Sequence, residues 1–432
     1  MAISIASVIT DEPRNLRILT VDAACEYEAL SLTTSAHSAW NLAPYQAINI
    51  RSSTGIPTKT VLDLPVEIFL RIAGCLRKRD LARLLCVSRA FHHTLIPILY
   101  ADISVDIPSA IKFFRTMTSV IGDEVPGMVR SLSIRGTKIP HFLEFHEFLH
   151  SIYPCLERMT GLRDVELAVP SYLKASVLLT LMSKKHVRSV SIIEALDLSS
   201  GGPADWAPFD RAVPLMHHLT TLQLTYSINP IPKSFAKYLS NLLKMHAGQL
   251  KHVDLNIQGL EHCNFLRSPL PCHELKTLSV PASVLADTSL FEHTPNLVSL
   301  GIHIPVGEPS PSVVEVPTNL LPNLSSYIGP SDVLTQLNLL AGRPLLSSLQ
   351  LDYARFGTEY GSIKDLYMPG REPRPFEVLS RVLMQMENAQ VRRVAIFLDS
   401  LSSESMEQVA PFMKSVEHLT IWLSQDWSVS YL

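Results

Sequence analysis

The densest hydrophobic pattern of the chain lies at residues 62–105 and predicts short helices. Ile68, Ile72 and Leu76 recur every four residues, which is the spacing of one face of a helix. Pro65 suits the first position of this helix, because an N–H donor is not needed there. The pattern therefore predicts a first helix that begins near Pro65 and carries an apolar stripe.

Two more short helices are expected in the same stretch. Asp80 is expected to cap a second helix, which runs through Leu81 and Leu84. Ser88 interrupts the rhythm, and a third helix should end at Pro97 before the chain becomes extended. The unit is too short to bury all its apolar positions internally, so it is expected to share its core with a partner or a neighbouring domain.

From residue 129 onward a phrase of the form apolar-x-x-apolar-x-apolar recurs, with copies that start 22 to 45 residues apart. The last two apolar positions alternate with polar ones, which predicts strands with one buried face. Helix-like stretches at 171–182, 231–246 and 376–387 lie between copies. The copies, including a weaker one at Leu324, start at Val129, Leu162, Val187, Leu219, Leu250, Leu275, Leu297, Leu324, Leu346, Val391 and Val416.

A strand followed by a crossover helix, repeated along the chain, predicts an α/β solenoid of parallel strands. The longest interval contains residues 359–375, which are expected to form an inserted loop. Polar strand residues that alternate with the core positions should line the concave face and are candidates for substrate recognition, although any one of them can simply be solvated. These candidates are Asp164, Glu166, Gln223, His252, Asp254, Gln350, Arg393 and His418.

The domain organisation expected from these patterns has three parts. Residues 1–58 form an N-terminal arm. Residues 33–60 are rich in Ser, Thr and Pro with little periodicity, so the arm is expected to be partly disordered. Residues 59–105 form the helical module, and residues 106–432 form the repeat array.

Composition narrows the class of protein. The chain has 432 residues, 47% of them hydrophobic and 18% charged, with a net charge of −3, so a general attraction to nucleic acid is not expected. Its six cysteines are scattered, which favours reduced thiols, and Cys75 and Cys86 are expected to fill the helical core. No apolar run is long enough for a membrane span, and Asp11 and Glu12 come too early for a secretory signal.

One short phrase matches a catalytic metal motif. His146, Glu147 and His150 fit the H-E-x-x-H pattern of zinc hydrolases, in which two His bind zinc and Glu acts as a base. Pro154 is expected to stop the helix one turn later, and no third ligand follows. The pairs at 262–263 and 272–273 offer another His and Cys set, but with an unusual spacing. Neither a metal nor a cofactor is therefore predicted.

The helical module carries an ordered set of motif residues. They are Leu64-Pro65-x-Glu67-Ile68-x3-Ile72-x3-Leu76, then Asp80-Leu81-x2-Leu84-x2-Val87-Ser88-Arg89-x-Phe91, then Pro97-x-Leu99-Tyr100. In order and spacing this set closely resembles the F-box. Substrate receptors use the F-box to dock onto the Skp adaptor of cullin–RING ubiquitin ligases. The resemblance implies that the adaptor-facing residues are Leu64, Pro65, Ile68, Ile72, Leu76, Leu81, Leu84, Val87 and Ser88.

The array resembles the leucine-rich repeats found behind many F-boxes, though only loosely, because the Asn or Cys expected after each strand is mostly missing. Together the two resemblances imply a non-catalytic substrate-recognition subunit of a Skp–cullin–F-box ubiquitin ligase in the cytoplasm or nucleus. Its partners would be the Skp adaptor, a cullin indirectly and an unknown protein substrate, with no cofactor, nucleic acid or membrane. Two alternatives stay open, a non-ligase scaffold that binds the adaptor and a zinc hydrolase built on His146 and His150.

Overall fold

The computed structural model describes residues 65–118, 124–136, 142–168, 175–193, 203–225, 231–257, 260, 263, 272–286, 289–304, 314–340, 343, 345–351, 391–398 and 415–423. The chain divides into two compact units, which are described separately. One unit contains the first helix, and the other contains every element from residue 77 onward. The predicted N-terminal arm, the loop expected at 359–375 and the stretch 376–387 lie outside the described residues.

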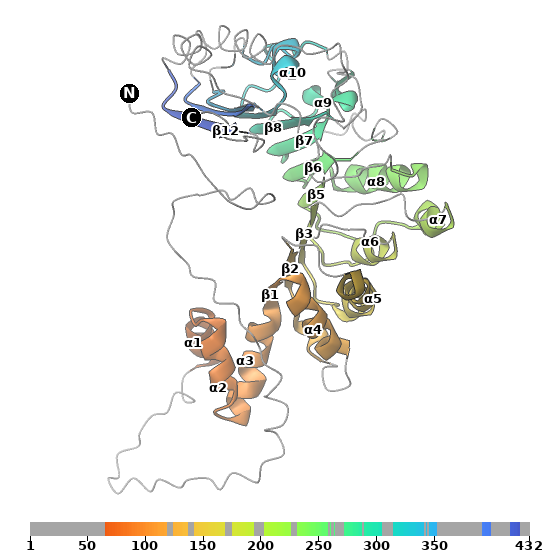
Figure 1. Ribbon diagram of the computed structural model, residues 1–432, viewed down its shortest axis with the longest axis vertical. Coiled ribbons are helices and arrows are strands. Elements are labelled where there is room, and N and C mark those ends of the chain that lie inside the picture. The colour runs from red at the N-terminus through yellow and green to blue at the C-terminus, as the bar shows by residue number, and fades with distance from the viewer. Residues whose placement is uncertain are drawn as a thin grey trace, which may run out of the picture. The chain divides into compact units, whose positions relative to one another are not determined.

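Twelve parallel strands form one sheet, in which each strand pairs with the next one along the chain (Figure 1). Such nearest-neighbour order is what a solenoid of repeats requires, so the predicted α/β solenoid is confirmed. The strands are β1 (Asp102–Val105), β2 (Ser131–Arg135), β3 (Asp164–Ala168), β4 (Ser189–Ile193), β5 (Thr221–Thr225), β6 (His252–Asn256), β7 (Thr277–Pro281), β8 (Ser299–His303), β9 (Ser326–Gly329), β10 (Ser348–Leu351), β11 (Arg393–Leu398) and β12 (His418–Leu423).

Every copy of the apolar phrase corresponds to one strand, from β2 to β12. The first strand of the sheet, β1, has no such copy, and it lies before the boundary expected at residue 106. It pairs with β2 along its whole length, from Asp102 beside Ser131 to Val105 beside Ile134. The sheet therefore begins inside the predicted helical module, directly after a helix that ends at Ala101.

Helices connect the strands in the first half of the array. In Figure 1, α4 to α8 lie on one side of the strands, as crossover connections between parallel strands must. In the second half the described connections contain only short helical turns. The helices are α4 (Ile107–Thr118), α5 (Phe142–Arg158), α6 (Ala175–Met182), α7 (Pro203–Arg211), α8 (Lys233–His246), α9 (Ser289–Glu292) and α10 (Ser331–Gln336).

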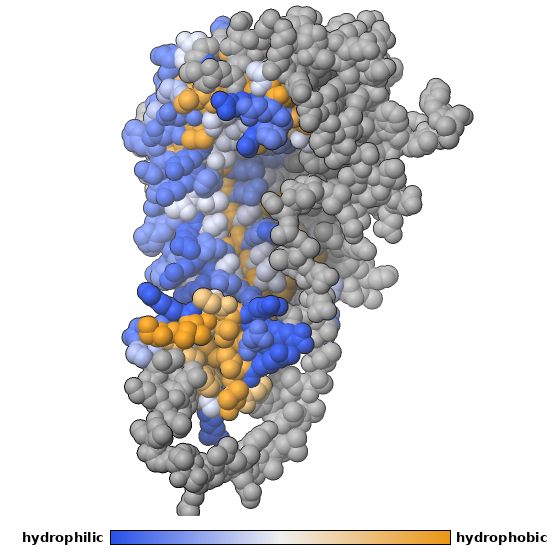
Figure 2. Space-filling model, turned by 90° about the vertical axis from the view of Figure 1, so that its left-hand side faces the viewer, coloured by the Kyte–Doolittle hydropathy of each residue, from blue (hydrophilic) through white to orange (hydrophobic). Residues whose placement is uncertain are grey.

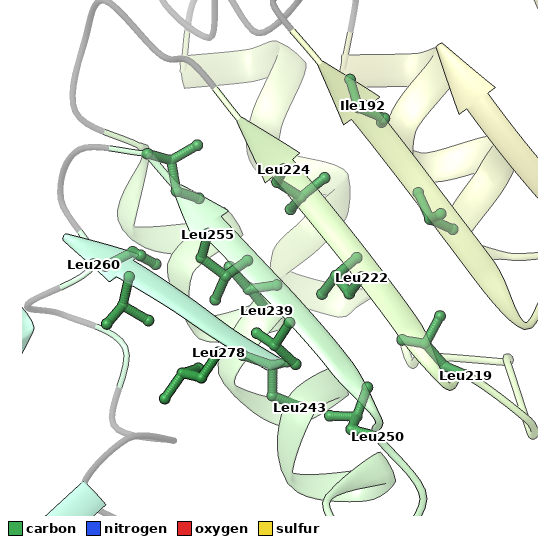
Figure 3. Close-up of a cluster of buried hydrophobic side chains, with 14 of the residues drawn as sticks. Ile192, Leu219, Leu222, Leu224, Leu239, Leu243, Leu250, Leu255, Leu260 and Leu278 are labelled. Atoms are coloured by element: carbon green, nitrogen blue, oxygen red, sulfur yellow. The ribbon is translucent and has the colours of Figure 1, made fainter. Parts of the chain in front are cut away.

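The core is a continuous layer between strands and helices. In the repeat of β5, Leu219, Leu222 and Leu224 are completely buried, and Figure 3 shows them beside Leu239 and Leu243 of α8. Burial of each such side chain contributes about 1.5–3 kcal/mol relative to exposure. The apolar positions of the repeated phrase are therefore the positions that hold neighbouring repeats together.

The helical module contains α1 (Val66–Gly74), α2 (Lys78–Leu85) and α3 (Arg89–Ala101). Two expected helix limits are wrong. The cap position of α2 is Arg77, and Asp80 lies inside the first turn, where a carboxylate still interacts favourably with the helix dipole. Pro97 does not end α3, which continues to Ala101, because a proline removes only one intrahelical hydrogen bond and the following residues remain helical.

Candidate binding surfaces

Large hydrophobic side chains are exposed in the helical module. On α1, Ile68 is 45% exposed and Ile72 is 47% exposed, and Val66 and Leu70 are exposed as well. In the turn between α2 and α3, Val87 is 65% exposed. Apolar surface of this extent on so short a segment is typical of a protein–protein interface.

The residues predicted to face the adaptor differ in their exposure. Pro65, Ile68, Ile72 and Val87 are exposed. Leu76 and Leu84 are half-buried, and Leu64 lies outside the described residues. Leu81 is only 3% exposed, so its side chain belongs to the interior of the isolated chain. Val66 and Leu70 were missed, although each lies only two positions from Ile68.

Ser88 has a structural role at the start of α3. Its side chain accepts a hydrogen bond from the Phe91 N–H over 3.2 Å, which makes it the N-cap of the helix. Lys78 at the start of α2 donates to the main-chain carbonyl of Asp102, and partial burial lowers the pKa of Lys78 although the Asp102 carboxylate opposes this. The Ser88 contact fixes the start of α3, and the Lys78 contact ties the start of α2 to the residue that follows α3.

The candidate substrate-facing residues lie in two rows across the sheet. Asp164, His252, Arg393 and His418 occupy the first position of their strands, and Arg393 and His418 are direct neighbours. Glu166, Gln223, Asp254 and Gln350 occupy the third position. All eight are exposed or half-buried. The visible strand face of the array in Figure 2 is largely blue and white, in keeping with these polar rows.

Several third-position residues form a hydrogen-bonded chain across β4, β5 and β6. Ser191 donates to Gln223 Oε1 over 2.6 Å, and Gln223 Nε2 donates to Asp254 Oδ2 over 2.9 Å. The other oxygen of Asp254, Oδ1, is buried and has no hydrogen-bond partner among the described residues. His303 Nε2 lies 3.7 Å from it. Gln223 and Asp254 are thus linked into one polar network.

Asp254, His303 and Ser279 bring a carboxylate, an imidazole and a hydroxyl together. Ser279 Oγ and His303 Nε2 lie 2.5 Å apart. In a hydrolase triad the nucleophile and the carboxylate contact opposite ring nitrogens, so that the ring can pass a proton between them. Here both approach Nε2, so this cluster lacks the geometry of a triad. Sequence reasoning missed His303, which continues the alternation of β8 to its fifth position.

The acidic residues of β3 are engaged by arginines. Arg188 donates to both carboxylate oxygens of Asp164 over 3.1 Å. Arg135 donates to both oxygens of Glu166 over 2.8 and 2.9 Å. Partial burial opposes the charged form of Glu166, but the hydrogen bonds from Arg135 and Ser133 and the charge of Arg135 outweigh it and hold the pKa of Glu166 below its usual value. The Glu166 carboxylate therefore stays ionised at neutral pH.

The H-E-x-x-H phrase lies on α5, and its expected end at Pro154 is wrong, since the helix continues to Arg158. Arg115 Nε donates to the carboxylate of Glu147 over 2.5 Å. The carboxylate that would act as the base in a hydrolase is therefore already paired with an arginine. Among the described residues, no group of three or more His, Cys, Asp and Glu is placed to hold a metal.

The cysteines fall into two environments. Burial raises the pKa of the Cys272 thiol to about 11, with Cys263 buried as well. Burial also raises the pKa of Cys155 to about 12. The expectation that Cys75 and Cys86 fill the core is wrong, because both are exposed. Both lie at helix ends, where the amphipathic pattern no longer decides which side is buried.

Comparison with protein families matches residues 61–105 to the F-box-like family. Comparison with curated proteins finds no significant relative of the chain. None of the described helices combines the length and the apolar character that a membrane crossing needs. The matched range contains α1, α2, α3 and β1, and a domain of this family supports a general role as an adaptor that binds the Skp protein. Residues 61–105 of this chain are therefore an F-box-like domain.

Proposed function

We propose that this protein is the substrate-recognition subunit of a Skp–cullin–F-box ubiquitin ligase. The observation that carries the proposal is the exposed apolar surface of the F-box-like domain, above all Ile68 and Ile72 on α1. An adaptor that covers these side chains removes apolar surface from water, and full burial of each contributes about 1.5–3 kcal/mol. Pro65, Leu76, Leu84 and Val87 belong to the same proposed contact.

The repeat array supplies the second half of the function. It would hold a target protein on its polar strand face, where Gln223, Asp254 and Glu166 offer fixed hydrogen-bond groups. Docking both the adaptor and the target would raise the effective concentration of the target near the ubiquitin-charged enzyme. The chain then contributes no catalytic residue of its own, and it acts in the cytosol or nucleus.

The test is co-purification of the full chain with its Skp adaptor. Replacing Ile68 and Ile72 with Glu places charges on the proposed contact, and we expect adaptor recovery to fall at least about tenfold, since desolvating an unpaired charge costs several kcal/mol. The matched control replaces Val213 and Leu215 with Glu, because both are exposed aliphatic residues of the array. This control should bind the adaptor normally.

Unchanged adaptor recovery with the Ile68 and Ile72 variant contradicts the proposal. Recruitment of a cullin is the separate readout for ligase function. A complex that contains the adaptor but no cullin, in cells where the target level does not respond to loss of the protein, would instead identify a non-ligase scaffold.

A further inference from the structure

The edge at which the chain enters the strands carries a regular row of residues. The residue just before each strand donates its N–H to the carbonyl of the equivalent residue in the preceding repeat, as Arg163 does to Arg130 over 2.7 Å and Lys276 to Lys251 over 2.9 Å. Neighbouring members are therefore about 4.8 Å apart, the spacing of paired strands. We name these residues the strand-entry row, and from β2 to β7 they are Arg130, Arg163, Arg188, Thr220, Lys251 and Lys276.

All members of this row except Thr220 are basic and exposed. Arg188 is neutralised by Asp164, and Arg130 Nη1 donates to the Gly161 carbonyl over 3.3 Å. Arg163, Lys251 and Lys276 form no ion pair with any residue that the structure describes. A chain with a net charge of −3 thus presents three basic side chains without an ion-pair partner among the described residues along one edge, with the neutralised Arg188 and the uncharged Thr220 between Arg163 and Lys251.

A cavity of about 530 Å³ continues the row where its charges end. Lys276 lines it together with Val298 and Ser325, the strand-entry residues of β8 and β9. Val298 is 39% exposed and Leu345, which also lines the cavity, is 52% exposed. The other lining residues, His273, Glu274, Asn296 and Asn323, are polar. Because Glu274 contributes a carboxylate beside Val298 and Leu345, this end of the edge suits an apolar side chain better than an anion.

We propose that this edge binds an acidic segment of a protein partner, with its carboxylates over Arg163, Lys251 and Lys276 and an apolar side chain in the cavity beside Val298 and Leu345. Arg130 and Lys276 are five strand spacings apart, about 24 Å, which an extended segment of about seven residues spans. The proposal deepens the proposed function, because it assigns a chemical class to the substrate that the array would hold.

An acidic protein segment fits the edge better than a nucleic acid does. The strand-entry row contains no aromatic side chain on which a base could stack. The cavity at the end of the row is lined by Glu274, whose carboxylate would repel a phosphate, and by the exposed side chains of Val298 and Leu345, which complement an apolar residue of a peptide. Exposed charge pairs are screened by salt, so binding should weaken as ionic strength rises.

The test uses the full chain and a fluorescein-labelled peptide of about eight extended residues, in which Glu and Ser alternate and Leu stands at each end. Replacing Arg163, Lys251 and Lys276 together with Gln should weaken binding at least about tenfold, because three charge contacts are lost. The matched control replaces Lys112, Lys233 and Lys237 with Gln, which removes the same charge from exposed positions on α4 and α8. This control should bind as the unchanged protein does.

A second variant examines the cavity. Leu345→Ser should weaken binding of the peptide with terminal Leu by several-fold, and it should leave binding of an otherwise identical peptide with terminal Ser unchanged. The proposal is overturned if the triple Gln variant binds as tightly as the unchanged protein. It is also overturned if a peptide with Gln in place of Glu binds equally well, or if single-stranded DNA of equal charge binds more tightly than the acidic peptide.

Adaptor recovery from the same preparations keeps this inference separate from the proposed function. The triple Gln variant should still co-purify with the Skp adaptor, because its three residues lie outside residues 61–105. The Ile68 and Ile72 variant should lose the adaptor and keep the acidic peptide. Each variant should therefore lose one binding activity and keep the other. A variant that keeps the activity it is expected to lose shows which of the two proposals has failed.

Discussion

Glu166 is held more firmly than the other carboxylates of the strand face. Arg135 and Ser133 donate three hydrogen bonds to it, two from Arg135 at 2.8 and 2.9 Å and one from Ser133 at 3.0 Å. Hydrogen bonds that are made only by the ionised carboxylate favour that form. The pKa of Glu166 in the folded protein therefore lies below the 4.5 of a free side chain.

An NMR titration of the Glu166 carboxyl should give a midpoint below 4.5, and Arg135→Gln should raise it. Because the folded pKa is depressed, the stabilisation is complete above the unfolded pKa and is lost as pH falls through the folded pKa. The difference in melting temperature between the unchanged protein and Arg135→Gln should therefore become smaller as the pH falls from the unfolded pKa of Glu166 through its folded pKa. Arg393→Gln on β11 is the control, and a midpoint that does not respond to Arg135→Gln would contradict the prediction.

The alternation of polar and apolar residues placed every candidate of the strand face on an accessible position, because a strand has only two faces. It did not identify Ser191, Ser279 or His303 as members of the same network, since hydrogen bonds across strands depend on register between repeats. In the helical module the pattern was less informative. Leu81 is buried because it lies on the apolar face of α2, whereas Cys86 is exposed because it is the C-cap of that helix, where the amphipathic pattern ends.

Ser88 determines how α3 begins. Its side chain satisfies the N–H of Phe91, one of the donors at a helix start that lack a partner within the helix. Ser88→Ala should lower the free energy of unfolding by about 1 kcal/mol, and Ser88→Asn should preserve most of it because Asn is also a good cap. Thermal unfolding of the three proteins measures the difference.

Adaptor binding distinguishes the two roles considered for Ser88. If it acts only as a cap, Ser88→Asn should bind the adaptor as the unchanged protein does. An Asn variant that is as stable as the unchanged protein but fails to bind the adaptor would show that the hydroxyl itself contacts the partner.

Elements were predicted well where the pattern was long and periodic, and less well at their ends. The stretch 231–246 became α8 (Lys233–His246), because Leu239, Leu243 and their neighbours form one buried face. Pro97 and Pro154 were expected to end helices, but both lie inside them. After Pro154 the helix continues through Cys155 and Leu156, which are completely buried, and such packing depends on tertiary structure that the sequence pattern does not contain.

At the scale of the whole molecule, β1 joins the F-box-like domain to the array. The family match ends at residue 105 and so includes β1, yet β1 is the first strand of the sheet. Ile103 and Val105 are packed against the array core. End repeats of a solenoid need a cap that covers their apolar face and backbone edge, and β1 with α3 provides one for β2.

Two truncated chains examine this cap directly. One begins at Asp102 and keeps β1, whereas the other begins at Asp106 and loses it. Removing β1 exposes the edge of β2 and part of the core beside Leu132, so the shorter chain should be less stable by about 2 kcal/mol, roughly the burial of two partly covered aliphatic side chains. It should also aggregate more readily, because an unpaired strand edge is a template for other chains. Equal melting temperatures and equal solubility of the two chains would mean that β1 belongs to the adaptor-binding domain alone and that the array caps itself at β2.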